Sequence, residues 1–248
     1  MAKDLFSKQS DLYARYRPTY PKELYNYILS FVKEKNIAWD CATGNGQAAV
    51  VLADHFKKVI ATDISAAQIE KAISKENIEY IVCPAESTPF EENTFDLVTV
   101  AQAYHWIKWG EFKREVMRVC KPGAIIAIWT YHRNTAGDKK VDEAIYNFYE
   151  NVTRPYWDDE RKYVEEKYAT VEFDYDLLPV KDFETTLEWR REDLLGYVGS
   201  WSAVQKFIKT NGYSPVPILE EEIKKLWPES EVKKVRFPIY LKFGRVLK

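Results

Sequence analysis

Short apolar runs alternate with helical segments between residues 37 and 129, and this alternation restricts the fold of the chain more than any other feature. Each run has about the length of a buried strand and contains few polar residues. Such runs are typical of a parallel sheet that helices cover on both faces. The predicted strands are 37–41, 58–62, 79–83, 95–100 and 124–129.

The pattern changes after Tyr131, where helical segments at 138–151 and 158–167 interrupt the alternation. A sixth strand is predicted at 183–189. An alternating apolar and basic segment at 232–246 predicts a last strand at an edge of the sheet, antiparallel to its neighbours. We therefore predict an α/β fold with a Rossmann-like, seven-stranded, mostly parallel sheet, helices on both faces and a helical insert after the fifth strand. In such sheets ligands bind beyond the carboxyl ends of the strands.

The composition argues against several classes of protein. A formal net charge of −2 gives the chain no general attraction for nucleic acid or for an anionic membrane. We expect no secretory signal and no membrane-spanning run, and the scattered cysteines Cys41, Cys83 and Cys120 favour a cytoplasmic protein without disulfides. Because the sequence has no Cys-x-x-Cys pair, we predict no structural zinc or iron–sulfur site and no bound metal.

A glycine loop follows the first predicted strand. Gly44, Gly46 and Ala49 fit the pattern Gly-x-Gly-x-x-Ala between a strand and a helix. The glycines allow a sharp turn and the close approach of a ligand, and the start of the helix offers unpaired N–H groups. The pattern alone fits a dinucleotide site as well as a methyl-donor site.

Two carboxylates narrow the choice of ligand. Asp40 precedes the loop, where it would repel a pyrophosphate but attract the ammonium of S-adenosylmethionine, a contact of about 4 kcal/mol before desolvation. Asp63 ends the second strand, where a carboxylate can accept both ribose hydroxyls of an adenosine ligand. In the alternative interpretations, Asp40 only ties down the loop and Asp63 only places a negative charge at the start of the next helix.

The ends of the later strands supply further candidates. Ala85 and Glu86 would lie near an adenine, although Glu86 fits a solvated loop charge equally well. Gln102 and His105 follow the fourth strand, where a transferred group would meet its acceptor. His105 is a base, a donor to an acceptor oxygen, or a structural imidazole. No Asn/Asp-Pro-Pro-Tyr/Phe element stands there, which argues against the enzymes that methylate exocyclic base amines.

Several segments together resemble a known family. Residues 39–49 resemble motif I of the class I methyltransferases, and residues 59–63 resemble the ribose-binding second strand of these enzymes. Residues 13–21, 99–106 and 200–204 look like the trans-aconitate methyltransferase-like group, which includes the plant embryo-abundant-type proteins. The resemblance implies S-adenosylmethionine as the cofactor and S-adenosylhomocysteine as the product.

One residue departs from the family pattern, because the family usually has glycine at the position of Ala42, where alanine is tolerable if φ is negative. The resemblance also implies that Tyr13 and Arg17 close the cofactor site from the N-terminal segment, although surface packing is an alternative for both. Gln102 would lie near the sulfonium. The predicted cofactor-binding residues are Tyr13, Arg17, Asp40, Ala42, Gly44, Gly46, Asp63, Ile64, Ala85, Glu86 and Gln102.

Aromatic residues cluster outside the predicted strands, and we expect the insert to form a lid over an acceptor site. A carboxylate acceptor is already ionised near neutral pH and needs no base. A hydroxyl or amine acceptor needs one, and His105 is then the candidate catalytic residue. The predicted acceptor-side residues are Tyr104, Trp106, Tyr131, His132, Tyr156, Trp157 and Trp201.

We predict an enzyme that methylates a small organic acceptor, with O-methylation of a carboxylate as one candidate reaction. The alternatives are a non-catalytic protein that binds S-adenosylmethionine or a nucleotide and, with less support, an NAD-dependent oxidoreductase. The expected partner is a small-molecule substrate, not nucleic acid or a membrane, and the chain is expected to be a monomer or a weak homodimer.

The resemblance implies one class I methyltransferase domain over residues 1–248. Its expected parts are an N-terminal helical segment over the cofactor (1–35), a cofactor-binding core (36–131), a helical insert or lid (132–180), and C-terminal strands and helices that complete the sheet (181–248).

Overall fold

The structure is a computed structural model that describes residues 16–248. At its centre is one eight-stranded sheet with the order β3-β2-β1-β4-β5-β8-β6, and β7 also pairs with β8. Strands β1 to β5 pair in parallel, whereas β8 is antiparallel to β5, β6 and β7. The strands are β1 (Ile37–Cys41), β2 (Lys58–Asp63), β3 (Ile78–Val82), β4 (Phe95–Ala101), β5 (Cys120–Tyr131), β6 (Asp176–Leu177), β7 (Phe183–Trp189) and β8 (Lys233–Arg245).

The predicted fold class is confirmed, with two corrections to the sheet. The additional strand β6 has only two residues, too few to give a sequence pattern. The last strand does not lie at an edge, because β8 has β5 on one side and β7 and β6 on the other. Gly244 makes the β6 pairing possible, since a Cβ there would stand 2.7 Å from the carbonyl oxygen of Asp176.

Strand β5 also begins earlier than predicted. The predicted strand was 124–129, but residues 120–123 also belong to it, so the strand starts at Cys120. Gly123 takes a φ of +80°, and the register between β4 and β5 shifts between Phe95 and Leu97. A bulge of this kind lets the strand continue through a Lys-Pro-Gly sequence that would otherwise end it.

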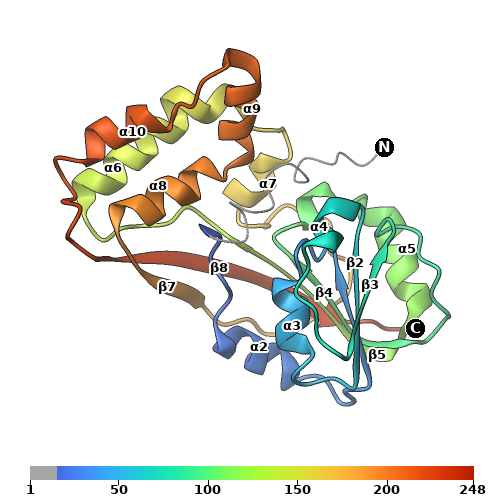
Figure 1. The fold of residues 1–248 in the computed structure, drawn as a ribbon. Coiled ribbons are helices and arrows are strands. Elements are labelled where there is room, and N and C mark those ends of the chain that lie inside the picture. Colours follow the sequence, from blue (N-terminus) through green and yellow to red (C-terminus); the bar gives the residue numbers. More distant parts are fainter. Residues whose placement is uncertain (1–15) are drawn as a thin grey trace.

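The helices form two groups (Figure 1). The first group lies around the parallel strands: α2 (Lys22–Leu29), α3 (Gln47–Leu52), α4 (Ala66–Glu70) and α5 (Trp109–Val119). The second group gathers at the other end of the molecule: α6 (Lys139–Phe148), α7 (Arg161–Glu165), α8 (Arg191–Gly199), α9 (Ser202–Asn211) and α10 (Val216–Ile223). Residues 16–248 also contain three short helical turns, which are η2 (Tyr104–Trp106), η3 (Tyr149–Thr153) and η4 (Arg154–Tyr156).

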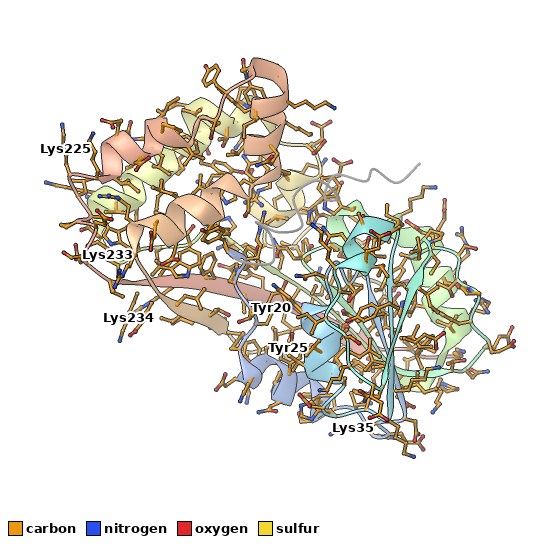
Figure 2. The ribbon with its side chains drawn as sticks, in the orientation of Figure 1. Tyr20, Tyr25, Lys35, Lys225, Lys233 and Lys234 are labelled. Carbon is orange, nitrogen blue, oxygen red and sulfur yellow. The ribbon has the colours of Figure 1, made fainter. Side chains whose placement is uncertain are left out.

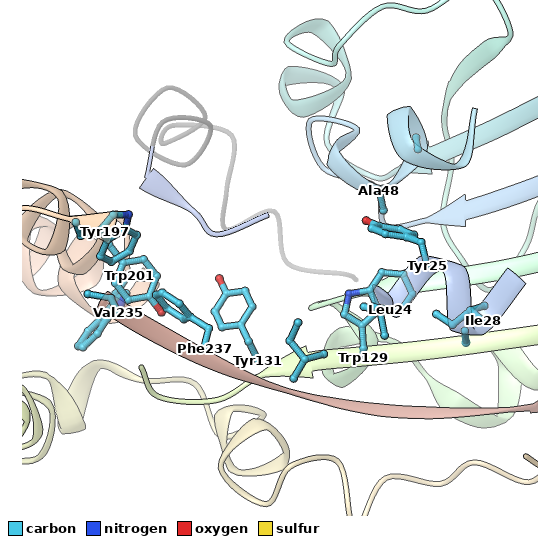
Figure 3. Close-up of a cluster of buried hydrophobic side chains, with 14 of the residues drawn as sticks. Leu24, Tyr25, Ile28, Ala48, Trp129, Tyr131, Tyr197, Trp201, Val235 and Phe237 are labelled. Carbon is cyan, nitrogen blue, oxygen red and sulfur yellow. The ribbon is translucent and has the colours of Figure 1, made fainter. Parts of the chain in front are cut away.

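Alternation along β5 explains why both faces of the sheet are covered. Its odd-numbered residues from Ile125 to Tyr131 join one buried cluster, and its even-numbered residues from Ala124 to Ile128 join the other. Successive side chains of a strand point to opposite faces, so a strand with no polar alternation needs two apolar layers. Figure 3 shows the first cluster, in which Trp129 packs near Tyr25 of α2.

Local signals fix several helix starts. The Ser65 hydroxyl accepts a hydrogen bond from the Gln68 N–H at 3.3 Å and so caps the N-terminus of α4. Asp138 caps α6 in the same way through the N–H groups of Lys140 and Val141. Within residues 16–248, no helix combines the length and the apolar character that crossing a bilayer requires.

Candidate functional site

The loop between β1 and α3 is held in an unusual backbone conformation. Ala42, Gly44 and Gly46 all have positive φ, at 54°, 57° and 86°. The Thr43 N–H donates to the Thr62 carbonyl at 2.9 Å, which anchors the loop to β2. Glycine is required at position 46 for a second reason, because a Cβ there would lie 2.2 Å from the hydroxyl oxygen of Tyr80.

Ala42 does not meet the condition under which alanine was expected to be tolerable. Its φ is positive, in the region where the Cβ of an L-residue crowds the following carbonyl and costs about 1–2 kcal/mol. The neighbouring anchor from Thr43 to β2 holds the backbone in this conformation. Ala42 nevertheless lines a cavity, so the strained residue lies at the surface that a ligand would contact.

Asp40 lies behind the loop and not on the cavity wall. It is buried, and its two oxygens accept hydrogen bonds from the hydroxyls of Thr43 at 2.5 Å and Thr99 at 2.7 Å. Burial raises the pKa of Asp40 to about 6, although these hydrogen bonds oppose the rise. This position favours the interpretation in which Asp40 ties down the loop, and any effect on a bound cation acts through that loop.

Asp63 and Glu86 line the cavity and each also binds backbone. One Asp63 oxygen accepts the Gly44 N–H and the other accepts the Ser65 N–H, both at 2.9 Å. Glu86 accepts the Lys108 N–H at 2.9 Å. These bonds fix the direction of both carboxylates, so Asp63 is pre-oriented at the carboxyl end of β2.

A cavity of about 560 Å³ opens above the carboxyl ends of β1 to β4, and we call it the larger cavity. Of the charged side chains that line it in the described part of the chain, four are acidic and one is basic, so this wall carries an excess of negative charge. The charged residues are Asp63, Glu86, Glu111, Glu160 and Lys108. Ile64, Ala85, Gly44 and Gln102 also line it, as predicted cofactor contacts would.

Gln102 lies at the junction of this cavity with a second one. It has a φ of 56°, and its Oε1 accepts hydrogen bonds from the Thr130 hydroxyl at 2.9 Å and the Tyr131 N–H at 2.8 Å. The two bonds to Oε1 fix the orientation of the amide, so the NH₂ group is the part that remains for a ligand. Trp106 likewise lines both cavities.

The second cavity has a volume of about 50 Å³, and we call it the smaller cavity. Arg161 contributes to its wall, and this guanidinium stacks over the Trp157 ring with 4.5 Å between Cζ and the ring centroid. The acidic residue on the wall, Asp158, is paired with Lys206 at 2.5 Å. Counting only residues 16–248, the smaller cavity therefore has an excess of basic side chains.

Arg17 adds a second cation to the smaller cavity. Its Nη1 donates to the Tyr131 hydroxyl at 2.7 Å and its Nη2 donates to the Ser200 carbonyl at 2.9 Å. Its guanidinium also lies over the Tyr197 ring at 5.4 Å. Sequence reasoning expected Arg17 at the cofactor, but among the described contacts it belongs to the smaller cavity. Tyr13, the other predicted residue of that segment, lies outside the described residues.

His105 lines the smaller cavity from η2. Its Nδ1 is 2.8 Å from the Tyr168 hydroxyl oxygen. Burial, and to a smaller extent the charge of Arg161, lowers the pKa of His105 to about 3. The imidazole is therefore neutral at physiological pH, and it is too weakly basic to remove a proton from a hydroxyl or an amine efficiently.

The remaining predicted acceptor residues divide into two sets. Trp157 and Trp201 line the smaller cavity. Tyr104 is buried and donates to the Glu172 carbonyl, and Tyr156 accepts from the Asn211 amide, so both have structural contacts and line neither cavity. Tyr131 lines neither cavity, and its hydroxyl accepts a hydrogen bond from Arg17. His132 is half-buried and packs near Tyr240. Burial and neighbouring cations lower the pKa of His132 to about 4.

The residues that sequence reasoning missed include Asp158, Arg161, Tyr197 and Ser202 in the smaller cavity, and Tyr20 in the larger one. Tyr20 lies near the centre of the molecule, whereas the labelled lysines lie at its periphery (Figure 2). Only Arg161 had a usable signal, because it lies in the segment predicted as helical at 158–167, close in sequence to Trp157, and a cation and an aromatic ring so close together can stack.

The chain is similar to several proteins named as methyltransferases. A family model described as a methyltransferase domain matches residues 39–128. A Dictyostelium discoideum protein named as a methyltransferase is 33% identical over 96% of this chain and 93% of its own length. The solved structure of a protein named as a type II methyltransferase, from Anaeromyxobacter dehalogenans, is 33% identical, with a TM-score of 0.85 over 93% of this chain and 98% of its own. A Saccharomyces cerevisiae protein named as an S-adenosylmethionine-dependent methyltransferase is 30% identical over 50% of this chain and 45% of its own length.

Proposed function

Because the chain belongs to the class I S-adenosylmethionine-dependent methyltransferases, we propose that it transfers the methyl group of S-adenosylmethionine to a small organic carboxylate. The observation that carries this proposal is the junction of two cavities of opposite charge, which share Gln102 and Trp106. An acidic chamber suits a cationic donor, and a basic chamber suits an anionic acceptor.

The residues of the larger cavity fit the proposed donor. Its excess of carboxylates suits a sulfonium and an ammonium, and would repel a pyrophosphate. Asp63 would accept the ribose hydroxyls, and Ile64, Ala85 and Glu86 would surround the adenine. The volume of about 560 Å³ lies in the usual range for small-molecule sites.

The smaller cavity fits a carboxylate head group. A volume of about 50 Å³ has room for a few water molecules or one such group, with the rest of the acceptor outside it. Arg17 and Arg161 supply guanidinium donors. The buried indole N–H of Trp157 has no hydrogen-bond partner among residues 16–248 and would add a neutral donor.

The bound donor supplies an electrophilic methyl group with a neutral thioether as its leaving group. The tasks that remain for this chain are to align the acceptor and to exclude water. The arginines would hold the carboxylate at the junction, Gln102 would donate its amide N–H to it, and Trp106 would cover the approach. A carboxylate is already ionised near neutral pH, so no residue has to remove a proton.

Binding and turnover test the proposal separately. S-adenosylhomocysteine should raise the melting temperature, and NADH should not. The reverse result would favour the NAD-dependent alternative. Labelled S-adenosylmethionine incubated with the protein and an acidic metabolite fraction should then give a labelled product, and stabilisation without any product would indicate a non-catalytic binding protein.

The chemistry of the product identifies the acceptor class. A methyl ester releases its label as volatile methanol when it is treated with alkali, whereas methyl ethers and methylamines retain the label. Release of most of the label is therefore expected. A product that resists alkali would contradict the carboxylate and leave the methyltransferase reaction intact.

A further inference from the structure

The contact between His105 and Tyr168 determines what His105 can do in the smaller cavity. Nδ1 of His105 is 2.8 Å from the phenolic oxygen, so a single proton is shared between these two atoms. The other ring nitrogen, Nε2, has no hydrogen-bond partner among the described residues, and His105 lines the smaller cavity. The position of the shared proton decides whether Nε2 is a donor or an acceptor.

The surroundings of Tyr168 indicate where that proton lies. Among residues 16–248, the phenolic oxygen forms one hydrogen bond, the one with Nδ1 of His105. Tyr168 is buried, and a buried hydroxyl whose proton finds no acceptor is destabilising. If Nδ1 carried the shared proton, the O–H of Tyr168 would have no acceptor, so Nδ1 is the acceptor.

We infer that Tyr168 donates its hydroxyl proton to Nδ1 and thereby holds His105 as the Nε2–H tautomer, a neutral hydrogen-bond donor that faces the smaller cavity. Tyr168 is fully buried and has a positive φ of 58°, a conformation that costs energy and that the surrounding contacts must maintain. Burial raises the pKa of Tyr168, which keeps the phenol protonated, and the lowered pKa of His105 keeps the ring neutral.

The tautomer follows from the contacts alone, whereas its part in catalysis rests on the proposed function. In methyl transfer, a lone pair of one carboxylate oxygen forms the new O–C bond, and the pair of the breaking C–S bond goes to sulfur. No proton is taken up or released in this step. An Nε2–H donor would hold the carboxylate beside the arginines, which is the donor role among those considered for His105 from the sequence, and it could not act as a base. The charged or titratable residues around this cavity are Arg17, Asp158, Arg161, Tyr168 and Tyr197.

Nitrogen-15 NMR of the full chain labelled at histidine tests the tautomer directly. The sequence has three histidines, so His55→Gln and His132→Gln variants assign the remaining signal to His105. At about pH 7 we expect a protonated Nε2 and an unprotonated Nδ1 on a neutral ring. A protonated Nδ1, or a charged ring, would overturn the inference, and the spectrum of the unmodified chain is sufficient to show it.

A Tyr168→Phe variant tests whether Tyr168 is the cause. Loss of the hydroxyl should produce a mixture of tautomers or the Nδ1–H form, and an unchanged Nε2–H form would remove Tyr168 from the explanation. These spectra are recorded without a methyl donor or a methyl acceptor, so they test the tautomer independently of the proposed function. The proposed function is tested by S-adenosylhomocysteine binding and by label transfer.

Turnover measurements distinguish a hydrogen-bond donor at His105 from a general base. With the acidic metabolite fraction as the acceptor source, His105→Phe should lower kcat about tenfold or more, and His105→Gln should recover part of it because its amide N–H can donate. With the methyl donor at saturating concentration, the rate of the unmodified chain should be flat from about pH 6 to 9. A rate that rises with one ionisation in this range, together with equal losses in both variants, would indicate a base.

Discussion

The two cavities differ in charge and in the way in which the chain builds them. The larger cavity is acidic, and most of its wall comes from short segments that directly follow β1, β2, β3 and β4. The smaller cavity is basic and aromatic, and its wall combines Arg17, η2, the segment around Trp157 and the start of α9. The first follows from the sheet itself, whereas the second depends on how distant helices dock. The difference predicts that donor binding and acceptor binding can be damaged separately.

The largest expected effect is the loss of donor binding on replacement of Asp63 by alanine. The carboxylate would bind the ribose hydroxyls and also holds the Gly44 N–H at 2.9 Å. Hydrogen bonds to charged groups contribute about 1.5–3 kcal/mol each, so S-adenosylhomocysteine affinity should fall at least about 100-fold by calorimetry.

Glu111→Gln is the matched control for Asp63. Glu111 lines the same cavity, but it forms a solvent-exposed ion pair with Lys108 at 3.3 Å, so its replacement should change affinity little. Unchanged affinity in Asp63→Ala would mean that the larger cavity is not the donor site.

Replacement of Arg161 by alanine tests the other half of the comparison. The acceptor KM should rise about 10- to 100-fold, since a charge-assisted contact to a carboxylate is lost, while affinity for S-adenosylhomocysteine stays within about twofold. Arg154→Ala is the control, because Arg154 is half-exposed and pairs with Glu150 and Glu165 at the surface. Equal losses of donor and acceptor binding in Arg161→Ala would show that the two cavities are not independent.

Donor binding should also depend on pH through Asp40. Burial raises the pKa of Asp40 to about 6, so the carboxyl is neutral below that pH and ionised above it. Because a cationic donor favours the ionised form, affinity for S-adenosylhomocysteine, which retains the ammonium, should rise about tenfold or less between about pH 5 and 7.

Calorimetry near pH 6 in two buffers of different ionisation enthalpy should detect the release of a proton on binding. In Asp40→Asn both the proton release and this part of the pH dependence should disappear. If the unmodified chain releases no proton, Asp40 acts only on the loop, through Thr43 and Thr99.

The smallest expected effect is a gain in stability from Ala42→Gly. Glycine adopts the φ of 54° without strain but loses more entropy on folding, so the net gain should be about 0.5–1 kcal/mol, or a few degrees in Tm. Ala48→Gly is the control, because Ala48 lines the same cavity but lies in helix α3. Glycine is unfavourable within a helix, so this variant should lower the free energy of unfolding by about 1 kcal/mol. A Tm that falls in both variants would show that the Ala42 methyl group contributes favourable packing.

Much of the larger cavity could be predicted from the sequence because its residues stand next to strands. Asp63 ends β2, and Glu86 and Gln102 follow β3 and β4, so the parallel sheet brings them to one edge. Their exact contacts could not be predicted. The φ of Ala42 depends on the bond that anchors the neighbouring Thr43 to β2, a tertiary contact that local sequence does not encode.

The smaller cavity was less predictable for a physical reason. Trp157 and Trp201 were proposed from aromatic density, but the positions of Arg161 and Tyr197 depend on how α7 and α8 pack, and these contacts span long stretches of the chain. The burial of His105 and its contact with Tyr168, 63 residues away, are of the same kind. Periodicity predicts which face of a helix is apolar, and it does not predict which other element that face will meet.

Strand β8 bears on how such an enzyme can admit its acceptor. Residues 239–245 pair with β5, and residues 233–239 pair with β7, so one uninterrupted strand joins the parallel sheet to the second group of helices (Figure 1). A rigid-body rotation of one half against the other would have to bend this strand and break its ladder of hydrogen bonds at Ile239. We therefore expect access to the smaller cavity to come from rearrangement within the segment 149–168, at constant separation of the two halves, and fluorescence energy transfer between probes on the two halves should not change when ligand binds.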